Sequence, residues 1–365
     1  MKLAIVIGTR PEIIKMSPII RQAQQRQLDY CLVHTGQHYS VNMDRIFFEE
    51  LGLPTPGHNL HVGSGSHAEE TGNMMIGLEK VFLAERPSVV LVEGDTNSVL
   101  AAALTATKLR IPVAHVEAGC RSFDRNMPEE INRVLTDHIS NILFAPTRVS
   151  RENLLKEGIS SRKIHVTGNT IVDAVLQNTA LENRNNVIPM SERLERNRYL
   201  LVTLHRQENV DSSENLSRLV QALELVGLTF NLPVLWPVHP RTRKRLVDFS
   251  ISEGGHVRLM QPVGYITFLR LLKDSALALT DSGGVQEEAC ILKVPCVTLR
   301  QNTELPETIE LGCNRLAGPD SESILNAAKF MMRAERNWSN PYGDGHAAER
   351  ILQILVKSDR NHFLR

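Results

Sequence analysis

Short apolar runs that alternate with helix-length segments constrain the fold of this chain most strongly. The segments between the runs, such as 12–24 and 97–109, have the length and apolar spacing of helices. Strands that are apolar on both faces and alternate with helices form a parallel sheet that helices cover on both sides. We therefore predict an α/β protein. The apolar runs are residues 2–8, 30–35, 88–95, 111–119, 141–146, 199–205, 232–239, 256–260, 275–282 and 294–299.

The alternation lapses once, and this lapse divides the chain into two α/β halves. Residues 181–198 are polar, contain a proline and have few apolar positions, which is typical of a linker. A chain of 365 residues is also longer than one typical core. A last helix-period run, 347–357, has no strand after it and is free to pack on either half. In open parallel sheets ligands bind beyond the carboxyl ends of the strands, so two facing sheets would enclose a cleft.

Charge and cysteine content narrow the class of protein. Lys plus Arg and Asp plus Glu both number 41, and this zero balance argues against a nucleic-acid or anionic-membrane binder. The five cysteines form no CxxC pair and no zinc pattern, which favours reduced thiols in the cytoplasm. The apolar run Leu3–Ile7 is too short for a signal peptide, and no apolar run approaches the roughly 18 residues of a membrane span. We expect a soluble, cytoplasmic protein.

The stretch GTRPEIIK (8–15) follows the first predicted strand. Gly8 permits a tight turn, Arg10 presents a guanidinium, and Pro11 suits the first turn of a helix. Lys15 lies one turn further on. A helix N-terminus beside an arginine and a lysine has the outline of a phosphate site. The alternative is a surface turn with solvated charges.

Two carboxylates end separate strands of the first half. Asp95 is the last residue of VLVEGD, and Glu117 is the last residue of VAHVE. Both would point into one crevice, where neighbouring charge and partial burial can separate their pKa values for acid and base work. For Asp95 the alternative is an N-cap of the next helix. Glu117 precedes Ala118 and Gly119 and has no capping role of its own.

The segment MPEEINR (127–133) predicts a helix that begins at Pro128. Glu129 and Arg133 are four residues apart, so we expect them on one helix face, with Glu130 facing elsewhere. The alternative to a functional pair is a plain helical salt bridge.

The second half presents two histidines at strand ends, His205 in TLHRQEN and His239 in WPVHPR. An imidazole at such a place can serve a phosphate or a proton. A lone histidine there is often a hydrogen-bonded core residue, but two in one domain favour function.

The stretch TDSGGVQEEAC (280–290) predicts a phosphate-binding corner. Ser282, Gly283 and Gly284 expose backbone N–H groups at a helix start, where the helix dipole favours an anion. Glu287 and Glu288 follow one turn later, and a carboxylate there can accept both ribose hydroxyls of a nucleotide. The alternative is an ordinary turn with two exposed glutamates.

Spaced blocks over nearly the whole chain closely resemble the non-hydrolysing UDP-N-acetylglucosamine 2-epimerase family, in particular its archaeal and some bacterial members. The match is specific because many blocks occur in order. The blocks are GTRPEIIK, EGDTNS, HVEAGCRS, MPEEINR, TGNT (167–170), LHRQEN, TDSGGVQEEA and NPYGDG (340–345).

The resemblance implies a GT-B fold with two Rossmann-like domains. We expect residues 1–170 to carry the sugar site, residues 171–345 to bind UDP, and residues 346–365 to form a helix that packs back on the N-terminal domain. It also implies a homodimer without metal or cofactor. The implied reaction interconverts UDP-GlcNAc and UDP-ManNAc for polysaccharide biosynthesis, through elimination of UDP, a 2-acetamidoglucal intermediate and re-addition.

The resemblance also implies roles for the strand-end residues. It leaves open which carboxylate is the acid and which the base. Pro262–Phe268 would receive the uracil. Catalytic roles fall on Asp95, Glu117, Glu129 and His205, and substrate contacts on Arg10, Lys15, Arg133, His239, Ser282, Gly283, Gly284 and Glu288.

Three departures from the family pattern bear on these roles. The family usually has leucine at Cys120 and arginine at Leu305, and the second change removes a cation. QHYS (37–40) differs from many bacterial members, which use this region for activation by a second UDP-GlcNAc.

Three alternative functions remain: an epimerase of UDP-2,3-diacetamido-2,3-dideoxyglucuronic acid, a glycosyltransferase of the same fold, and a nucleotide-sugar sensor, which would not need the carboxylates.

Overall fold

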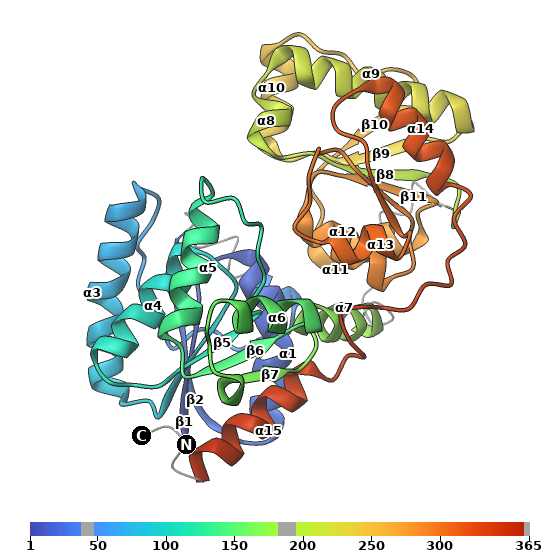
Figure 1. Cartoon of the computed structure of the whole chain (residues 1–365). Coiled ribbons are helices and arrows are strands. Elements are labelled where there is room, and N and C mark those ends of the chain that lie inside the picture. The colour runs from blue at the N-terminus through green and yellow to red at the C-terminus, as the bar shows by residue number, and fades with distance from the viewer. Residues whose placement is uncertain (38–46, 182–194, 361–365) are drawn as a thin grey trace. The chain divides into compact units, whose positions relative to one another are not determined.

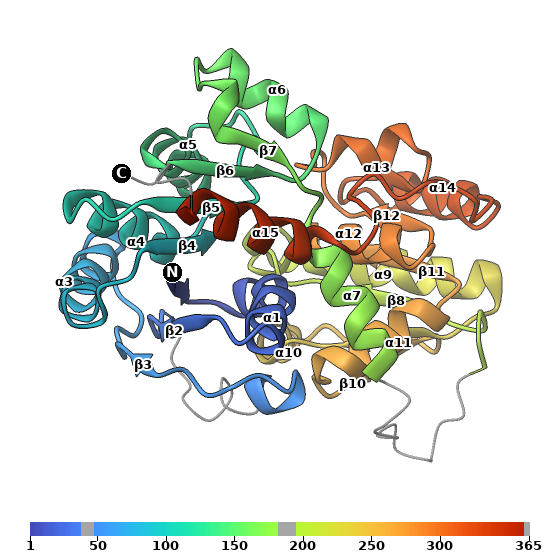
Figure 2. The same ribbon diagram turned by 90° about the horizontal axis from the view of Figure 1, so that it is seen from below.

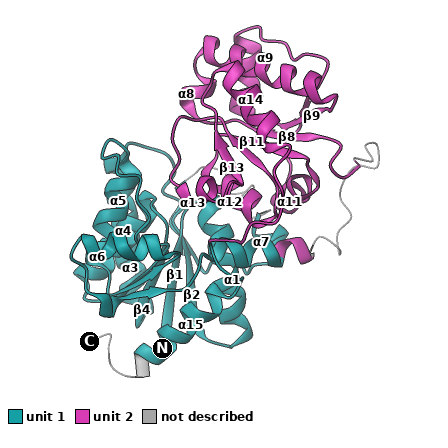
Figure 3. Cartoon of the chain, turned by 45° about the vertical axis from the view of Figure 1, so that its right-hand side comes forward, with its two compact units in different colours: residues 1–177, 342–365 teal, residues 178–341 magenta. Residues whose placement is uncertain are grey.

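The computed structural model describes residues 1–37, 47–181 and 195–360 and divides the chain into two compact units (Figure 3). Unit 1 comprises Met1–Gln177 and Tyr342–Arg365, and unit 2 comprises Asn178–Pro341. Most of the predicted linker lies outside the described residues. No helix in the described part of the chain combines the length and apolarity that a membrane crossing requires.

Unit 1 is built on a seven-stranded sheet with strand order β3-β2-β1-β4-β5-β6-β7, and every recorded pairing is parallel (Figure 1). Its strands are β1 (Lys2–Ile7), β2 (Asp29–His34), β3 (His58–Asn59), β4 (Val89–Glu93), β5 (Val113–Val116), β6 (Ile142–Ala145) and β7 (Ile164–Val166). Its helices are α1 (Arg10–Gln25), α3 (His67–Glu85), α4 (Asn97–Lys108), α5 (Pro128–Ile139), α6 (Arg148–Lys156), α7 (Thr170–Leu181, which crosses the unit boundary) and α15 (Ala347–Arg360).

Unit 2 repeats this construction with a six-stranded parallel sheet of order β10-β9-β8-β11-β12-β13. Its strands are β8 (Leu200–Thr203), β9 (Val234–Pro237), β10 (Val257–Met260), β11 (Leu277–Thr280), β12 (Cys296–Thr298) and β13 (Asn314–Leu316). Its helices are α8 (Gln207–Val210), α9 (Ser213–Phe230), α10 (Pro240–Asp248), α11 (Tyr265–Asp274), α12 (Gly283–Ile291), α13 (Pro306–Glu310) and α14 (Ser321–Met331).

Side-chain alternation along β8 shows why the strands read as continuous apolar runs. Leu200 and Val202 pack with α9 and α14 in one core cluster, whereas Leu201 packs with α11 and α12 in another. A strand that is covered on both faces needs apolar residues at every position. The predicted α/β class and all ten predicted strands are therefore confirmed, while the edge strands β3, β7 and β13 were missed because they span only two or three residues.

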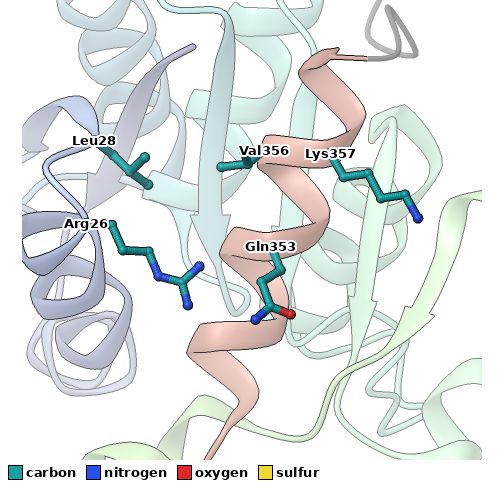
Figure 4. Close-up of a pocket in the computed structure, with 5 residues that line it drawn as sticks. All are labelled: Arg26, Leu28, Gln353, Val356 and Lys357. Atoms are coloured by element: carbon teal, nitrogen blue, oxygen red, sulfur yellow. The ribbon is translucent and has the colours of Figure 1, made fainter.

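The last helix, α15, belongs to unit 1 and contacts α1 (Figure 2). The backbone N–H groups of Ala347 and Ala348 donate to the carboxylate of Asp173, which fixes the start of α15. Helices α1 and α15 also border a pocket with the five lining residues of Figure 4, in which Lys357 points away from Arg26. This pocket contains none of the predicted site residues.

Candidate active site

The predicted site residues of unit 1 follow three neighbouring strands. Strand β1 lies between β2 and β4, because the chain runs outward through β2 and β3 and then returns to the other side of β1. Ligand sites of open α/β sheets concentrate at such a reversal, beyond the carboxyl ends of the strands. Residues after β1, β4 and β5 thus meet at one edge of the sheet.

The turn from β1 into α1 is tight because Gly8 has no room for a side chain. A Cβ at Gly8 would lie 2.0 Å from Ser98 Oγ and 2.5 Å from Thr35 Oγ1. Glu12 is buried and accepts hydrogen bonds from Gly8 N at 2.6 Å, Thr9 Oγ1 at 2.9 Å and Thr96 Oγ1 at 2.7 Å. Burial raises the pKa of Glu12 to about 7, although these three hydrogen bonds act to lower it.

Arg10 begins α1 and is exposed, with its guanidinium 5.9 Å from the ring centroid of Phe47. The structure places Arg10 at the helix N-terminus, and its role in binding a phosphate stays a prediction.

Lys15, Glu117 and Glu93 form a largely enclosed cluster of charge. The Lys15 ammonium contacts Glu117 Oε2 and lies 3.7 Å from Glu93 Oε1. Burial would raise the pKa of Glu117, but Lys15 and a hydrogen bond from Glu93 hold this pKa below its usual range. Burial raises the pKa of Glu93 well above its usual range, and Lys15 opposes that rise only in part. One carboxyl is thus favoured as an anion and its neighbour as an acid.

The backbone at Glu117 is unusual. Glu117 has φ +69°, a left-handed conformation that is uncommon for residues other than glycine and that clusters at functional sites. Gly119 has φ +82°, and a Cβ there would lie 2.2 Å from the Ser150 carbonyl oxygen. This turn redirects the chain directly after β5, where Glu117 contacts Lys15.

Asp95 pairs with Arg133 of α5. The Arg133 guanidinium lies 2.5 Å from Asp95 Oδ2. Burial raises the pKa of Asp95, and Arg133 opposes this effect. The capping alternative for Asp95 is wrong, because Thr96 is the N-cap of α4 and accepts a hydrogen bond from Val99 N. The Asp95 carboxylate is therefore not committed to a helix end.

The expected pairing within α5 is wrong. Glu130, and not Glu129, contacts Arg133, at 2.9 Å, and its carboxylate accepts hydrogen bonds from Ser122 N and Phe123 N. Side chains three residues apart on a helix can also contact each other. The hydrogen bonds from the loop before α5 keep the Glu130 side chain buried. Glu129 is exposed.

A buried network fixes the ends of β4 and β5 to each other. His115 Nδ1 lies 2.7 Å from Asp137 Oδ1, and His115 Nε2 lies 2.8 Å from the Gly94 carbonyl oxygen. Gly119 N donates to Asp137 Oδ2 at 3.0 Å. Hydrogen bonds of the buried His115 and Asp137 thus fix the turns that carry Asp95 and Glu117.

The site residues of unit 2 gather at the corresponding reversal, between β8 and β11. His205 follows β8, is half-exposed, and places Nδ1 3.0 Å from Oδ1 of the buried Asp281. Burial would raise the pKa of Asp281, but hydrogen bonds from His205 and Asn209 lower it. His239 follows β9 and caps α10 by accepting a hydrogen bond from Arg241 N at 3.2 Å.

The corner at the start of α12 leaves open space around its glycines. Ser282 is the N-cap, and neither Gly283 nor Gly284 has a positive φ. A Cβ at either glycine would have its nearest neighbouring atom 3.9 Å away. Neither backbone conformation nor packing among the described residues therefore requires glycine here, and the predicted phosphate-binding role of these glycines stays a prediction.

The two glutamates of α12 are buried, so the alternative of two exposed glutamates is wrong. Glu288 Oε1 accepts a hydrogen bond from the Tyr265 hydroxyl at 2.9 Å. Tyr265 is the first residue of α11, within the predicted uracil segment. Burial and then the charge of Glu288 raise the pKa of Tyr265 well above its usual range, so Tyr265 donates this bond.

Comparison with known proteins identifies the family. The model for UDP-N-acetylglucosamine 2-epimerase matches residues 21–356. The chain belongs to the UDP-N-acetylglucosamine 2-epimerase family. Among similar curated proteins is the UDP-N-acetylglucosamine 2-epimerase of Methanocaldococcus jannaschii, 55% identical over 98% of this chain and 99% of that protein. The Methanococcus maripaludis enzyme of the same name is 53% identical over 97% and 98% of the two chains.

Solved structures of the epimerase family share the fold. One is the M. jannaschii enzyme, which was crystallised in complex with UDP-GlcNAc and UDP. Its alignment with this chain covers 98% of this chain and 100% of the M. jannaschii chain, with a TM-score of 0.90 and 55% identity. The kitacinnamycin glycosyltransferase, with a TM-score of 0.57 and 12% identity, shows the fold alone. The fold is GT-B-like, as predicted.

The sequence analysis did not single out Glu93 and Asp281, which contact predicted residues of the candidate site. Asp281 directly follows β11, so its position at a strand end could have identified it. Glu93 was assigned to a strand, where nothing marks it as functional. Leu305 precedes α13, and in the same TELPE block Glu304 pairs with Arg300 at 2.8 Å. Residues 38–40 of QHYS lie outside the described residues.

Proposed function

We propose that the chain interconverts UDP-GlcNAc and UDP-ManNAc. The observation that carries this proposal is the juxtaposition of Lys15, Glu117 and Glu93, with Asp95 and Arg133 at the same sheet edge. Carboxyl groups whose pKa values are pushed in opposite directions are what proton removal and proton return require. Family membership supports a UDP-sugar as the substrate.

In the proposed reaction the bond between carbon 1 and the diphosphate oxygen breaks, and a carboxylate takes the carbon-2 proton. The electrons of the C–H bond form the double bond of 2-acetamidoglucal, and UDP leaves. UDP then adds back to carbon 1, and a proton returns to the opposite face of carbon 2. Because no carbonyl acidifies the carbon-2 proton, stabilisation of the leaving diphosphate supplies much of the rate.

Glu117 is the proposed base and Asp95 the proposed acid. Lys15 helps keep Glu117 anionic, whereas burial favours the protonated form of Asp95. The two roles exchange in the reverse direction. In this scheme Arg133 lies beside the sugar. We also propose that Glu129 lies near the sugar, as the family resemblance implies.

The diphosphate is assigned to N–H groups and cations. Asp281 engages Nδ1 of His205, which leaves Nε2 for a phosphate oxygen. Within unit 2, Ser282, Gly283 and Gly284 add N–H groups at the start of α12. The family resemblance assigns a diphosphate contact to Arg10 as well.

The nucleoside is assigned to unit 2. Glu288 binds the ribose hydroxyls, with its other contact to Tyr265 fixing the carboxylate. Pro262–Phe268 receives the uracil, and His239 contacts the substrate from the end of β9.

The family resemblance further supports a homodimer, activation by a second UDP-GlcNAc, and a role in polysaccharide biosynthesis as proposals. The five cysteines, all within the described residues, form no disulfide, in keeping with the cytoplasmic location that we propose.

Solvent deuterium tests the proposal. With UDP-GlcNAc in deuterated water, the product should carry deuterium at carbon 2, as measured by proton NMR. Full conversion without deuterium would exclude the elimination mechanism, and absence of conversion would exclude the substrate. The same assay with UDP-2,3-diacetamido-2,3-dideoxyglucuronic acid tests the second candidate, which a 42% identical Pseudomonas aeruginosa relative of that 2-epimerase name supports.

A further inference from the structure

Glu93, which has no proton-transfer role in the proposed mechanism, lies beside Lys15 in the unit 1 site. It is the last residue of β4, and its side chain is 2% exposed. In the register of β4 and β5, Glu93 pairs with Val116, the residue directly before Glu117. Its Oε1 atom makes no hydrogen bond to any group that the structure describes. A buried carboxyl oxygen in this state is costly unless the group is neutral or serves a purpose.

The contacts place a proton between Glu93 and Glu117. Both buried carboxyl groups face one ammonium, that of Lys15, and two neighbouring carboxyls that share a single cation do not both ionise, so one of the two must be protonated. Lys15 contacts Glu117 directly but lies 3.7 Å from Glu93, and the Asn169 amide donates to Glu117 Oε2 at 3.4 Å. The negative charge therefore belongs on Glu117 and the proton on Glu93.

The surrounding charges agree with this placement. The ammonium of Lys15 balances one carboxylate but not two. Glu12 on α1 raises the pKa of Glu93 further. The other titratable or charged groups at this edge are Asp95, whose pKa burial raises, and its partner Arg133. A neutral Glu93 leaves Lys15 and Glu117 as one compensated pair.

We propose that Glu93 is a positioning residue for the epimerase reaction, which donates a hydrogen bond to Glu117 and, with Lys15, holds that carboxylate for proton transfer at carbon 2. The proposal rests on the proposed function of Glu117. A fixed donor restrains the orientation of the Glu117 carboxylate, and orientation of a base is worth a large share of rate.

Two substitutions of Glu93 test whether its role is to donate a hydrogen bond or to carry a charge. Glu93→Gln keeps a neutral donor of the same shape, so kcat at pH 7 should stay within about threefold of wild type. Glu93→Leu removes the donor, so kcat should fall by at least about tenfold while KM changes by less than about threefold. Above the pKa of Glu93 the wild-type kcat should fall, because the donor and its proton are lost. Glu93→Gln should not show this fall.

Val92→Ala provides a matched control. Val92 is a buried neighbour in β4 whose side chain points to the opposite face of the sheet, so its truncation weakens the strand without reaching Lys15. This variant should melt at a lower temperature with kcat unchanged. An equal loss of kcat in Val92→Ala and Glu93→Leu would show a merely structural effect and overturn the proposal.

A substrate-free measurement keeps the proposal separate from the proposed function. In protein with 13C-labelled glutamate carboxyls, the resonance that disappears in Glu93→Gln should titrate well above the ordinary range of about 4.3. An ionised signal at pH 6 would overturn the proposal even if turnover is absent. With turnover present, unchanged kcat in Glu93→Leu, or a Glu93→Gln variant as impaired as Glu93→Leu, would also overturn it.

Discussion

Replacing Lys15 with methionine removes the cation that compensates Glu117 and lies 3.7 Å from Glu93. Methionine keeps most of the length of the side chain, so the change is mainly one of charge. In the wild type Lys15 lowers the pKa of both carboxyls. In the variant both pKa values rise, and Glu117 binds a proton at neutral pH rather than remain an uncompensated buried anion.

The size of the effect follows from the cost of that proton. A group that must be protonated in the fold costs about 1.4 kcal/mol for each pH unit above its unfolded pKa of about 4.3. The free energy of unfolding should therefore fall by up to about 2 kcal/mol at pH 6 and by up to about 5 kcal/mol at pH 8. The upper value agrees with the roughly 3–5 kcal/mol lost when one partner of a buried ion pair is removed.

The sign of the pH dependence is distinctive. Glu117 in the wild type has a lowered folded pKa, so its contribution to stability is present above about pH 4.3 and is lost as the pH falls through the folded pKa. In the variant the folded pKa is raised, so stability is lost as the pH rises. The two proteins should thus be nearly equally stable near pH 4 and diverge toward pH 8.

Urea unfolding measured by far-UV circular dichroism between pH 4 and pH 8 tests this prediction. Trp236 and Trp338 both belong to unit 2, so tryptophan fluorescence provides an internal reference for the unit without the substitution. Lys2→Met, which removes a partly exposed pair with Glu85, is a control that should change little. A difference of the same size at pH 5 and pH 8 would show that Lys15 acts through packing, and no difference at pH 8 would refute the charge cluster.

Two further substitutions test the two units separately. Glu117→Gln should lower kcat by about 10²–10⁴-fold, because an amide cannot accept the carbon-2 proton, while calorimetry should find UDP affinity within about tenfold of wild type. A large loss of UDP affinity would contradict the role given to Glu117. Gly284→Ala should leave thermal stability unchanged or raise it by up to about 1 kcal/mol, because a Cβ has space there and alanine favours a helix. It should weaken UDP binding by at least about tenfold, since the methyl group blocks the approach of a phosphate to the backbone; unchanged UDP affinity would remove Gly284 from the diphosphate site.

The sequence predicted the backbone positions of the candidate site residues better than the contacts of their side chains. Strand ends are local features, so the positions of Asp95, Glu117, His205 and Ser282 at the edges of their sheets followed from apolar runs and the residues after them. In a parallel sheet with helices on both faces, that edge is where ligands bind. The position of Gly283 and Gly284 at the start of α12 was likewise predicted from the residues around them.

The amino-acid sequence by itself determined the α/β class and the two halves, because strands that are buried on both faces appear in it as apolar runs. The spaced sequence blocks indicated the family, and the residues after the runs indicated the sheet edges to which we assign function. Only the tertiary structure decided which groups act together. Lys15 and Glu117 are 102 positions apart, and their contact depends on the strand order around β1. The protonation of Glu93 depends on burial and on those neighbours, and the choice of Glu130 over Glu129 as the partner of Arg133 depends on a loop that precedes the helix. Desolvation and charge act through space, so no local pattern in the sequence records them.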